Sequence, residues 1–240
     1  MAWLKQRYGA QRFFFTDECV ALSPAKRLCQ QIIDKKLDIK WTCEMRFEKH
    51  LTRDLLASMR DAGCLKIVFG LESFNQRVMD FMKKGIKQEW VRRISDDCID
   101  LGIAVHCYII VGFPTEKEEE ARETMNFIVE NERLHGSYGF SCQPCLFDLE
   151  KEAPIMSDPG SYGIRRIMRP SAEDLSLGFF YEVSEGMTPD EAERLYQHVY
   201  EKVSEVVCEL PFNYSMADGL LYIARAKAQG VREPQPAGLS

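Results

Sequence analysis

The sequence predicts an α/β fold in which parallel strands form an incomplete (β/α) TIM-like barrel, followed by a C-terminal helical extension. Two observations lead to this prediction. Runs of β-branched and aromatic residues alternate with amphipathic runs at the spacing of βαβ units, which implies parallel strands joined by right-handed crossovers. The fifth strand-like run contains Pro144. Because proline within a sheet is confined to edges and bulges, this strand is expected at an edge, so that the sheet stays open.

Each predicted strand is a short apolar run with polar residues at its ends. The central strand is expected over residues 65–73, LKIVFGLES, where aliphatic and aromatic residues lead to Gly70 and then to Glu72. A glycine at this place lets another group approach the backbone closely. The other strands are expected over residues 12–16, 39–46, 103–111 and 138–145.

The predicted helices are identified by their capping residues and by a period near 3.6. Gly9 ends a helix over residues 1–8, and Ser23 is the expected N-cap of the next helix, with Pro24 at its first position. Thr52 is expected to cap a third helix, which Gly63 ends. Further helices are expected over residues 75–84, 88–101 and 116–133.

The composition changes after the fifth predicted strand. Residues 153–170 hold several prolines and glycines and are expected to form a long loop. The segment from Thr188 to Glu191 resembles a capping box and opens an amphipathic helix, and a shorter helix is expected over residues 217–227. We therefore divide the chain into a partial barrel, residues 1–150, and a C-terminal loop and helical extension, residues 151–240.

The overall composition is that of a globular protein, with 45% hydrophobic residues in 240. The net charge of −6 does not suggest a general nucleic-acid or membrane-surface binder. The sequence shows no apolar run of transmembrane length and no signal-peptide pattern, so a cytoplasmic location is expected. Nine scattered cysteines, an odd number, are expected to be free thiols. The one C-x-x-C, Cys142 to Cys145, has no second pair and is not expected to hold a metal.

Polar side chains fall on one face of the predicted strands, toward their ends, because successive strand residues point to opposite faces. Binding sites in α/β folds lie at the carboxyl ends of parallel strands, so this face is the candidate site. The alternative is that these groups only meet solvent or pair with one another. The residues concerned are Thr16, Glu18, Thr42, Glu44, Arg46, Gly70, Glu72, His106 and Tyr108.

Four segments together make the sequence resemble a known family. FFFTDE, WTCEMR, GLES and IIVGFPTE occur in this order at strand ends. They resemble the second to fifth strands of the barrel of radical S-adenosylmethionine (SAM) enzymes, of the type often fused to a cobalamin-binding domain. The resemblance covers residues 3–163 and implies a partial barrel without its first strand.

The resemblance also implies roles for individual residues in SAM binding. Thr16, Asp17 and Glu18 stand where the methionyl amine and carboxylate are contacted. Glu72 and Ser73 match a motif that contacts the ribose or the methionyl group.

Further roles follow for the later strands. Ile110, Gly112 and Pro114 match the turn against which adenine packs, and Gln143 lies on the strand whose backbone meets adenine. SAM or substrate is expected to face Glu44, Arg46, His106 and Tyr108. The alternatives are that Glu72 is a plain ion-pair partner, that GFP is an ordinary strand–helix turn, and that Arg46 pairs with a neighbouring glutamate.

The sequence departs from the family at the iron–sulfur cluster. The family holds a 4Fe–4S cluster on a C-x-x-x-C-x-x-C loop after its first strand, and no such spacing occurs among the nine cysteines. We therefore expect no metal ligands in this chain and an N-terminal truncation that removes the first strand and the cluster loop. Cobalamin use is possible for this type, but no residue of the sequence supports it.

Three functional hypotheses follow. The first is the catalytic barrel of a radical SAM enzyme that acts on a small molecule or peptide. The second is a relative without a cluster that binds SAM or a partner and is not catalytic. The third is an unrelated βα-barrel enzyme in which Glu18, Glu44, Glu72 and His106 perform acid–base chemistry. The sequence does not indicate the substrate or the oligomeric state.

Overall fold

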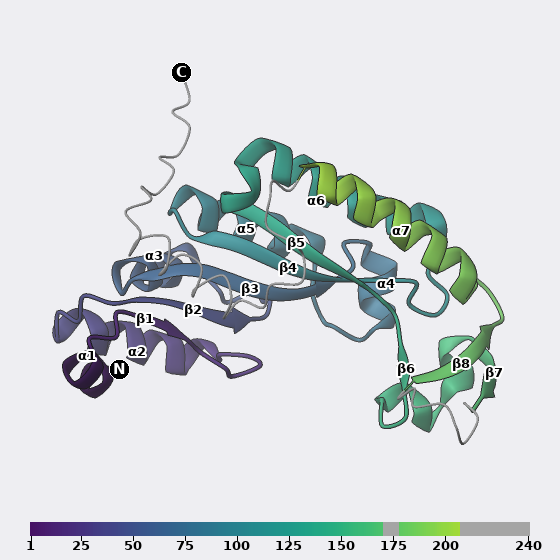
Figure 1. The fold of residues 1–240 in the computed structure, drawn as a ribbon, viewed down its shortest axis with the longest axis horizontal. Helices are drawn as coiled ribbons and strands as arrows, with labels where there is room; N and C mark the ends of the chain where they lie inside the picture. The colour runs from purple at the N-terminus through teal and green to yellow at the C-terminus, as the bar shows by residue number, and fades with distance from the viewer. Residues whose placement is uncertain (170–177, 207–240) are drawn as a thin grey trace.

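The computed structural model describes residues 1–169 and 178–206. Its main feature is a five-stranded parallel sheet whose spatial order follows the chain (Figure 1). The first and last strands are the two edges, so the sheet is open, and the edge position predicted from Pro144 is confirmed. The strands are β1 (Arg12–Phe14), β2 (Lys40–Met45), β3 (Cys64–Glu72), β4 (Ala104–Val111) and β5 (Phe140–Leu146).

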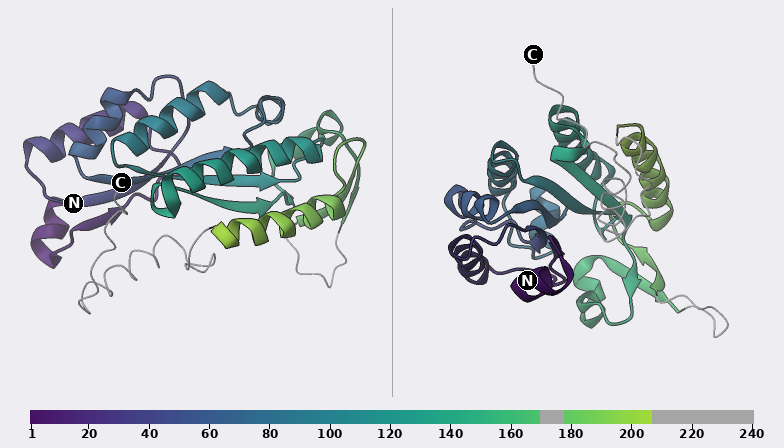
Figure 2. Two further views of the ribbon diagram at one scale, coloured as in Figure 1. Left: turned by 90° about the horizontal axis from the view of Figure 1, so that it is seen from above. Right: turned by 60° about the vertical axis from the view of Figure 1, so that its left-hand side comes forward.

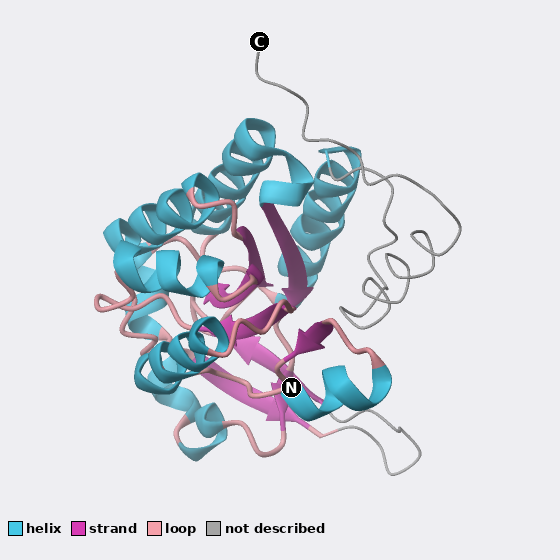
Figure 3. Cartoon of the chain, turned by 90° about the vertical axis from the view of Figure 1, so that its left-hand side faces the viewer, coloured by secondary structure: helices cyan, strands magenta, loops and turns pink. Residues whose placement is uncertain are grey.

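Helices cover one face of this sheet, as crossover connections between parallel strands require (Figures 2 and 3). These are α2 (Leu22–Asp34), α3 (Arg53–Asp61), α5 (Gln88–Asp100) and α6 (Glu118–Gly139). Three more helices lie outside this layer or at its ends: α1 (Ala2–Tyr8) before β1, α4 (Gln76–Phe81) after β3, and α7 (Pro189–Val206), which packs against α6 and β5.

The hydrophobic core lies between the sheet and these helices. In β4 every second residue is buried, and its neighbours on the other face are only half-buried, so period-two alternation decides which face is packed. Trp41 of β2 is buried in the core, and its indole N–H donates to the carbonyl of Ala62 at 2.8 Å. Phe47 and Phe69 stack with their ring centroids 4.0 Å apart.

Helix boundaries agree with the capping residues in some places and not in others. Gly9 ends α1 in the left-handed conformation, and the Thr52 hydroxyl accepts the amide of Leu55, as predicted. The prediction that Ser23 caps α2 is wrong, because the helix begins at Leu22 with Ala21 before it and no side-chain cap. Leu22 packs against the core, so burial of this side chain outweighs the hydrogen bond that a serine cap would provide.

The segment after β5 contains structure that was predicted to be loop. β6 (Leu149–Glu150), β8 (Gly178–Val183) and β7 (Ile164–Met168) form a small antiparallel sheet in that spatial order. Two 3₁₀ turns, Pro154–Ser157 and Pro159–Tyr162, lie between β6 and β7. This sheet has its own hydrophobic cluster of Leu149, Ile155, Ile164, Tyr181 and Val183.

The capping box before α7 is confirmed. The Thr188 hydroxyl accepts the amide of Glu191, and the Glu191 carboxylate accepts the amide of Thr188 at 2.8 Å. The helix predicted over residues 217–227 lies outside the described residues. Within residues 1–169 and 178–206, no helix has the length and apolar character needed to cross a bilayer.

Candidate ligand-binding site

The face of the sheet opposite α2, α3, α5 and α6 is lined by polar side chains, and we call it the polar face. Strand register arranges it in layers. Thr42 pairs with Lys66, and one layer nearer the carboxyl ends Glu44, Val68, His106 and Ser141 are in register. The next layer holds Gly70, Tyr108 and Gln143. The polar face predicted from alternation is therefore continuous across β2 to β5.

The carboxyl ends of all five strands lie along one edge of the sheet, because the strands are parallel. Thr16, Asp17 and Glu18 follow β1 at this edge and are exposed. The next backbone contact ties them to β2, since the Val20 amide donates to the Glu44 carbonyl at 2.8 Å. The three predicted contacts to the methionyl group thus lie beside the end of β2.

Glu72 lies at the end of β3 in a distorted backbone. Its φ is +64°, and the β3–β4 register shifts between Gly70 and Glu72. A Cβ at Gly70 would lie 2.9 Å from the Glu72 carboxylate and 3.7 Å from the Lys84 ammonium, so the glycine leaves room for both groups. The Lys84 ammonium pairs with Glu72 at 3.0 Å. The carboxylate is therefore held over the polar face by a strained turn and a cation.

Arg46 lies near this pair. Its guanidinium donates to the carbonyl of Lys84, and no carboxylate among the described residues lies within ion-pair distance of it. Glu44 instead lies 3.5 Å from the Tyr108 hydroxyl, which donates to it. Burial raises the pKa of Glu44, and the Tyr108 hydrogen bond opposes this shift.

Ser73 has a different position from the other predicted contacts. Its side chain is fully buried, and its hydroxyl lies 3.1 Å from the Thr124 hydroxyl of α6. Thr124 also accepts the Phe74 amide at 2.9 Å. The structure thus does not bring Ser73 together with the polar-face residues, and its hydroxyl connects the end of β3 to α6.

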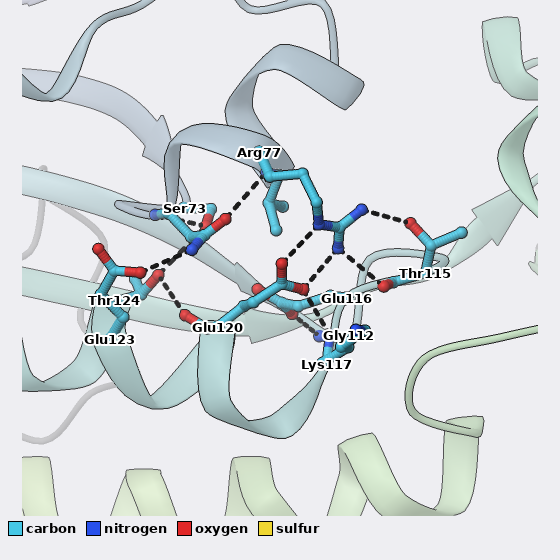
Figure 4. Close-up of polar contacts among 11 residues, drawn as sticks. Ser73, Arg77, Gly112, Thr115, Glu116, Lys117, Glu120, Glu123 and Thr124 are labelled. Atoms are coloured by element: carbon cyan, nitrogen blue, oxygen red, sulfur yellow. Dashed lines mark hydrogen bonds and ion pairs between the residues drawn. The ribbon is translucent and has the colours of Figure 1, made fainter.

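The turn after β4, Gly112 to Glu116, is held from several sides (Figure 4). The buried Glu116 carboxylate accepts the Gly112 amide at 2.8 Å. Burial raises the pKa of Glu116 to about 7, and the Gly112 hydrogen bond opposes this shift. Arg77 of α4 donates to the Thr115 carbonyl at 2.9 Å and pairs with Glu120 of α6.

Thr115 is strained within this turn. Its φ is +72°, a conformation that is rare for β-branched residues. Gly186, between β8 and α7, lies so close that a Cβ there would meet the Thr115 carbonyl carbon at 2.6 Å. The Met187 amide then donates to the Glu116 carbonyl at 2.8 Å. The small antiparallel sheet and α7 therefore fix this turn, for which the family resemblance predicts a role in adenine packing.

In the middle of the polar face, three neutral side chains, Ser141, His106 and Tyr108, contact one another in that order. His106 Nδ1 lies 2.9 Å from the Ser141 hydroxyl, and the His106 and Tyr108 rings meet edge to face at 5.5 Å. Burial, together with the charge of Lys66, lowers the pKa of His106 to about 3, so the imidazole is neutral at physiological pH. A neutral imidazole can donate from one nitrogen and accept at the other, which suits hydrogen bonding to a ligand.

Ile110 and Gln143 complete the predicted set. Ile110 is half-buried on the polar face of β4, and Gln143 is exposed on β5, in register with Tyr108. Gly112 and Pro114 are buried in the turn. The structure therefore gathers the tips of β1 to β5 at one edge, with Ser73 turned away.

Sequence reasoning missed Lys66, which lies on the polar face at the layer of Thr42. Burial lowers the pKa of its ammonium. The signal was present, because Lys66 is separated by even numbers of residues from Gly70 and Glu72 on the same strand.

A metal ion or an iron–sulfur cluster needs several ligating side chains close together. Over residues 1–169 and 178–206, no group of three or more His, Cys, Asp and Glu side chains could hold a metal ion. Of the cysteines in this part, Cys19 and Cys145 are exposed and six are buried free thiols. The described residues therefore do not fit a 4Fe–4S cluster, whereas the polar face presents carboxylates and other hydrogen-bonding groups.

The fold and this arrangement define the chain as a partial βα barrel with a polar candidate site at its strand ends. Residues 1–128 match the family described as the Radical SAM superfamily. This match covers more than half of the 240 residues. The chain belongs to the radical SAM superfamily.

Two curated relatives match about half of the chain. An uncharacterized methyltransferase from Pyrococcus horikoshii is 28% identical over 126 residues, which are 52% of this chain and 27% of the relative. The tRNA-2-methylthio-N(6)-dimethylallyladenosine synthase of Aquifex aeolicus is 29% identical over 136 residues, 53% of this chain and 30% of the relative. The chain thus spans less than a third of the length of these relatives.

Solved structures share the fold. The radical SAM methyltransferase TsrM from Kitasatospora setae, with cobalamin and a [4Fe-4S] cluster bound, matches with a TM-score of 0.58 at 17% identity. The match covers 81% of this chain and 39% of the TsrM chain. The cobalamin-dependent enzyme OxsB, with aqua-cobalamin and SAM bound, has a TM-score of 0.57 at 14% identity, covering 81% and 34%. Coproporphyrinogen III oxidase (HemN) from Escherichia coli has a TM-score of 0.52 at 12% identity, covering 82% and 40%. These likenesses confirm the α/β partial barrel.

Proposed function

We propose that this chain forms the SAM-binding part of a radical SAM enzyme. The observation that carries the proposal is that Glu18, Glu44, Glu72 and the Gly112 turn all lie at the carboxyl ends of parallel strands, along one edge of the sheet. Family membership supports it and argues against an unrelated βα-barrel enzyme. The roles of the individual residues are part of the proposal.

The polar face supplies what a SAM ligand needs. Glu72 would accept hydrogen bonds from ribose hydroxyls or from the methionyl amine, and the paired Lys84 holds it in position. Ile110 and the Gly112 turn offer an apolar surface and backbone groups for adenine. Glu44, His106 and Tyr108 lie deeper and would face the substrate.

The whole enzyme would cleave SAM reductively and perform radical chemistry on a substrate that these residues do not identify. The cluster supplies the electron for this reaction in the family, and we assign no such step to this chain because the residues that the structure describes do not fit the cluster. Cobalamin use is part of the proposal only by analogy with the solved structures of TsrM and OxsB. The second candidate is a SAM-binding relative that is not catalytic, and the observation that favours it is that no C-x-x-x-C-x-x-C spacing occurs in these 240 residues.

The test is binding of S-adenosylhomocysteine, followed by NMR on the full chain. We expect shifts at β2 to β5 polar-face residues, and Glu72→Gln should weaken binding about tenfold because it removes a charge-assisted hydrogen bond. Glu89→Gln, at an exposed position of α5, is the matched control and should bind as the wild type does. Shifts confined to the helix-covered face, or none at millimolar ligand, would refute the proposal.

A second expected result concerns the cluster. Anaerobic incubation of the full chain with iron and sulfide should leave no stable 4Fe–4S cluster after desalting, because no three cysteines have the required spacing. Iron and sulfide content together with the visible absorption spectrum give the measurement. A chain that retains four irons and the brown colour of a cluster would show that cysteines distant in the sequence can supply the ligands.

A further inference from the structure

Lys66 of β3 is a half-buried charged group on the polar face. It lies in register with Thr42 of β2 and Ala104 of β4, one layer below Glu44, His106 and Ser141. Its neighbour two residues along, Val68, is buried but does not belong to the core under the helices. Lys66 therefore faces the polar side of the sheet.

The Lys66 ammonium has no carboxylate within 4.0 Å among the residues that the structure describes, whereas Lys84, at the end of β3, is paired with Glu72. The nearest carboxylate by register, Glu44, is one layer closer to the carboxyl edge and is contacted by Tyr108. Desolvation lowers the pKa of Lys66, because burial makes the charged ammonium less favourable than it is in water. Charged groups in such surroundings normally have a partner.

The groups around Lys66 are neutral and can donate hydrogen bonds. His106 is uncharged, and its Nδ1 lies against the Ser141 hydroxyl, which leaves its second ring nitrogen for another contact. Tyr108 follows on the same strand, one layer higher. A positive charge without a carboxylate partner, flanked by neutral donors, is the arrangement that recognises an anion.

We propose that Lys66 is the anchor for an acidic group, a carboxylate or a phosphate, on the substrate of this barrel. This inference rests on the proposed function, because it places the substrate below the SAM site on the same face. The substrate would enter from the carboxyl edge, extend past Glu44 and Tyr108, and place its anionic end between Lys66 and His106. Lys66 acts here as a specificity residue and takes no part in bond breaking.

The test uses inorganic phosphate and propionate as separate probes, titrated into the full chain and followed by NMR of the His106 and Ser141 signals. We expect saturable shifts with at least one probe, and the comparison of the two tells a phosphate site from a carboxylate site. Lys66→Met should weaken probe binding about tenfold or more because the charge-assisted hydrogen bond is lost, and Lys66→Arg should restore part of it.

The controls separate this inference from folding and from the proposed function. Lys66→Met should unfold at the same or a higher temperature than the wild type, since a desolvated charge is removed. Lys87→Met, at an exposed position, should bind the probes as the wild type does. S-adenosylhomocysteine should bind Lys66→Met as it binds the wild type. If the wild type does not bind S-adenosylhomocysteine but does bind a probe, the SAM site is refuted and the anion site is not. Probe shifts that are identical in Lys66→Met, or absent at tens of millimolar, would overturn the anion site.

Discussion

Replacing Gly186 by alanine should destabilise the protein by about 3–5 kcal/mol, a loss at the upper end for single substitutions. The residue has a φ of +82°, which costs a non-glycine residue about 1–2 kcal/mol. The larger part of the lost stability comes from steric overlap. The new Cβ would lie 2.6 Å from the Thr115 carbonyl carbon, 2.7 Å from the Thr115 Cα and 2.8 Å from the Glu116 carbonyl oxygen. These are backbone atoms of a turn fixed by Arg77 and cannot move alone. Urea unfolding followed by circular dichroism gives the measurement.

Gly102→Ala is the matched control for this substitution. Gly102 also has a positive φ, +74°, but a Cβ there would meet nothing within 4 Å. It should therefore lose only the conformational part, about 1–2 kcal/mol. Equal losses at the two positions would show that the region between β8 and α7 does not press on the Gly112–Glu116 turn.

Replacing Glu132 by leucine should stabilise the protein by about 3 kcal/mol at pH 8. Glu132 of α6 is 2% exposed, and neither of its carboxylate oxygens has a well-formed hydrogen bond. Burial raises its pKa to about 7 from an ordinary value near 4.5, and contacts with Cys142 oppose this shift only in part. At pH 8 the folded protein must therefore hold a charge that the unfolded chain holds freely in water.

The pH dependence of this effect has a definite sign. Below about pH 4.5 the Glu132 carboxyl is protonated in both the folded and the unfolded chain, so its ionisation has no effect on stability. Between about pH 4.5 and pH 7 the unfolded chain loses the proton first, and the wild type should lose stability relative to Glu132→Leu across this window. Above pH 7 the difference should be constant. The thiols facing it, Cys107 of β4 and Cys142 of β5, are buried and have raised pKa values, so they stay protonated there.

Glu130→Leu, an exposed position on the same helix, is the control for this series. Its stability relative to the wild type should not change between pH 5 and pH 8 by more than a few tenths of a kcal/mol. Thermal unfolding at several pH values and constant salt measures the stability of the wild type, Glu132→Leu and Glu130→Leu. A flat difference between wild type and Glu132→Leu over the same range would show that the carboxylate reaches water or a partner in solution.

The sequence determined the parallel sheet and the polar face because both depend on local periodicity. Alternation in β4 follows the predicted pattern at every residue. Where tertiary contacts determine the orientation of a side chain, the prediction from local sequence was wrong. Ser73 follows Glu72 directly, but the strained backbone at the end of β3 turns its hydroxyl toward Thr124 on α6. A short motif does not reveal such a turn.

The small antiparallel sheet was missed for a related reason. β6 has two residues, and β7 follows a segment rich in proline and glycine, so neither produces a run that favours a strand by itself. Its stability comes from pairing across long sequence separations, such as Leu149 with Phe179. The strained Thr115 likewise depends on Arg77 and Gly186, which lie 38 and 71 positions from it in the chain. Partners this distant cannot be identified from local patterns.

The agreement between spatial order and chain order in the large sheet has a consequence for biosynthesis. Each strand from β2 to β5 pairs with the strand made just before it, so no strand has to wait for a distant segment. The sheet can grow one βα unit at a time as the polypeptide leaves the ribosome, with each helix covering the new strand. Chains halted after β3, β4 and β5 on stalled ribosomes should then show stepwise gains in protease resistance, and a single gain at full length would indicate folding only after release.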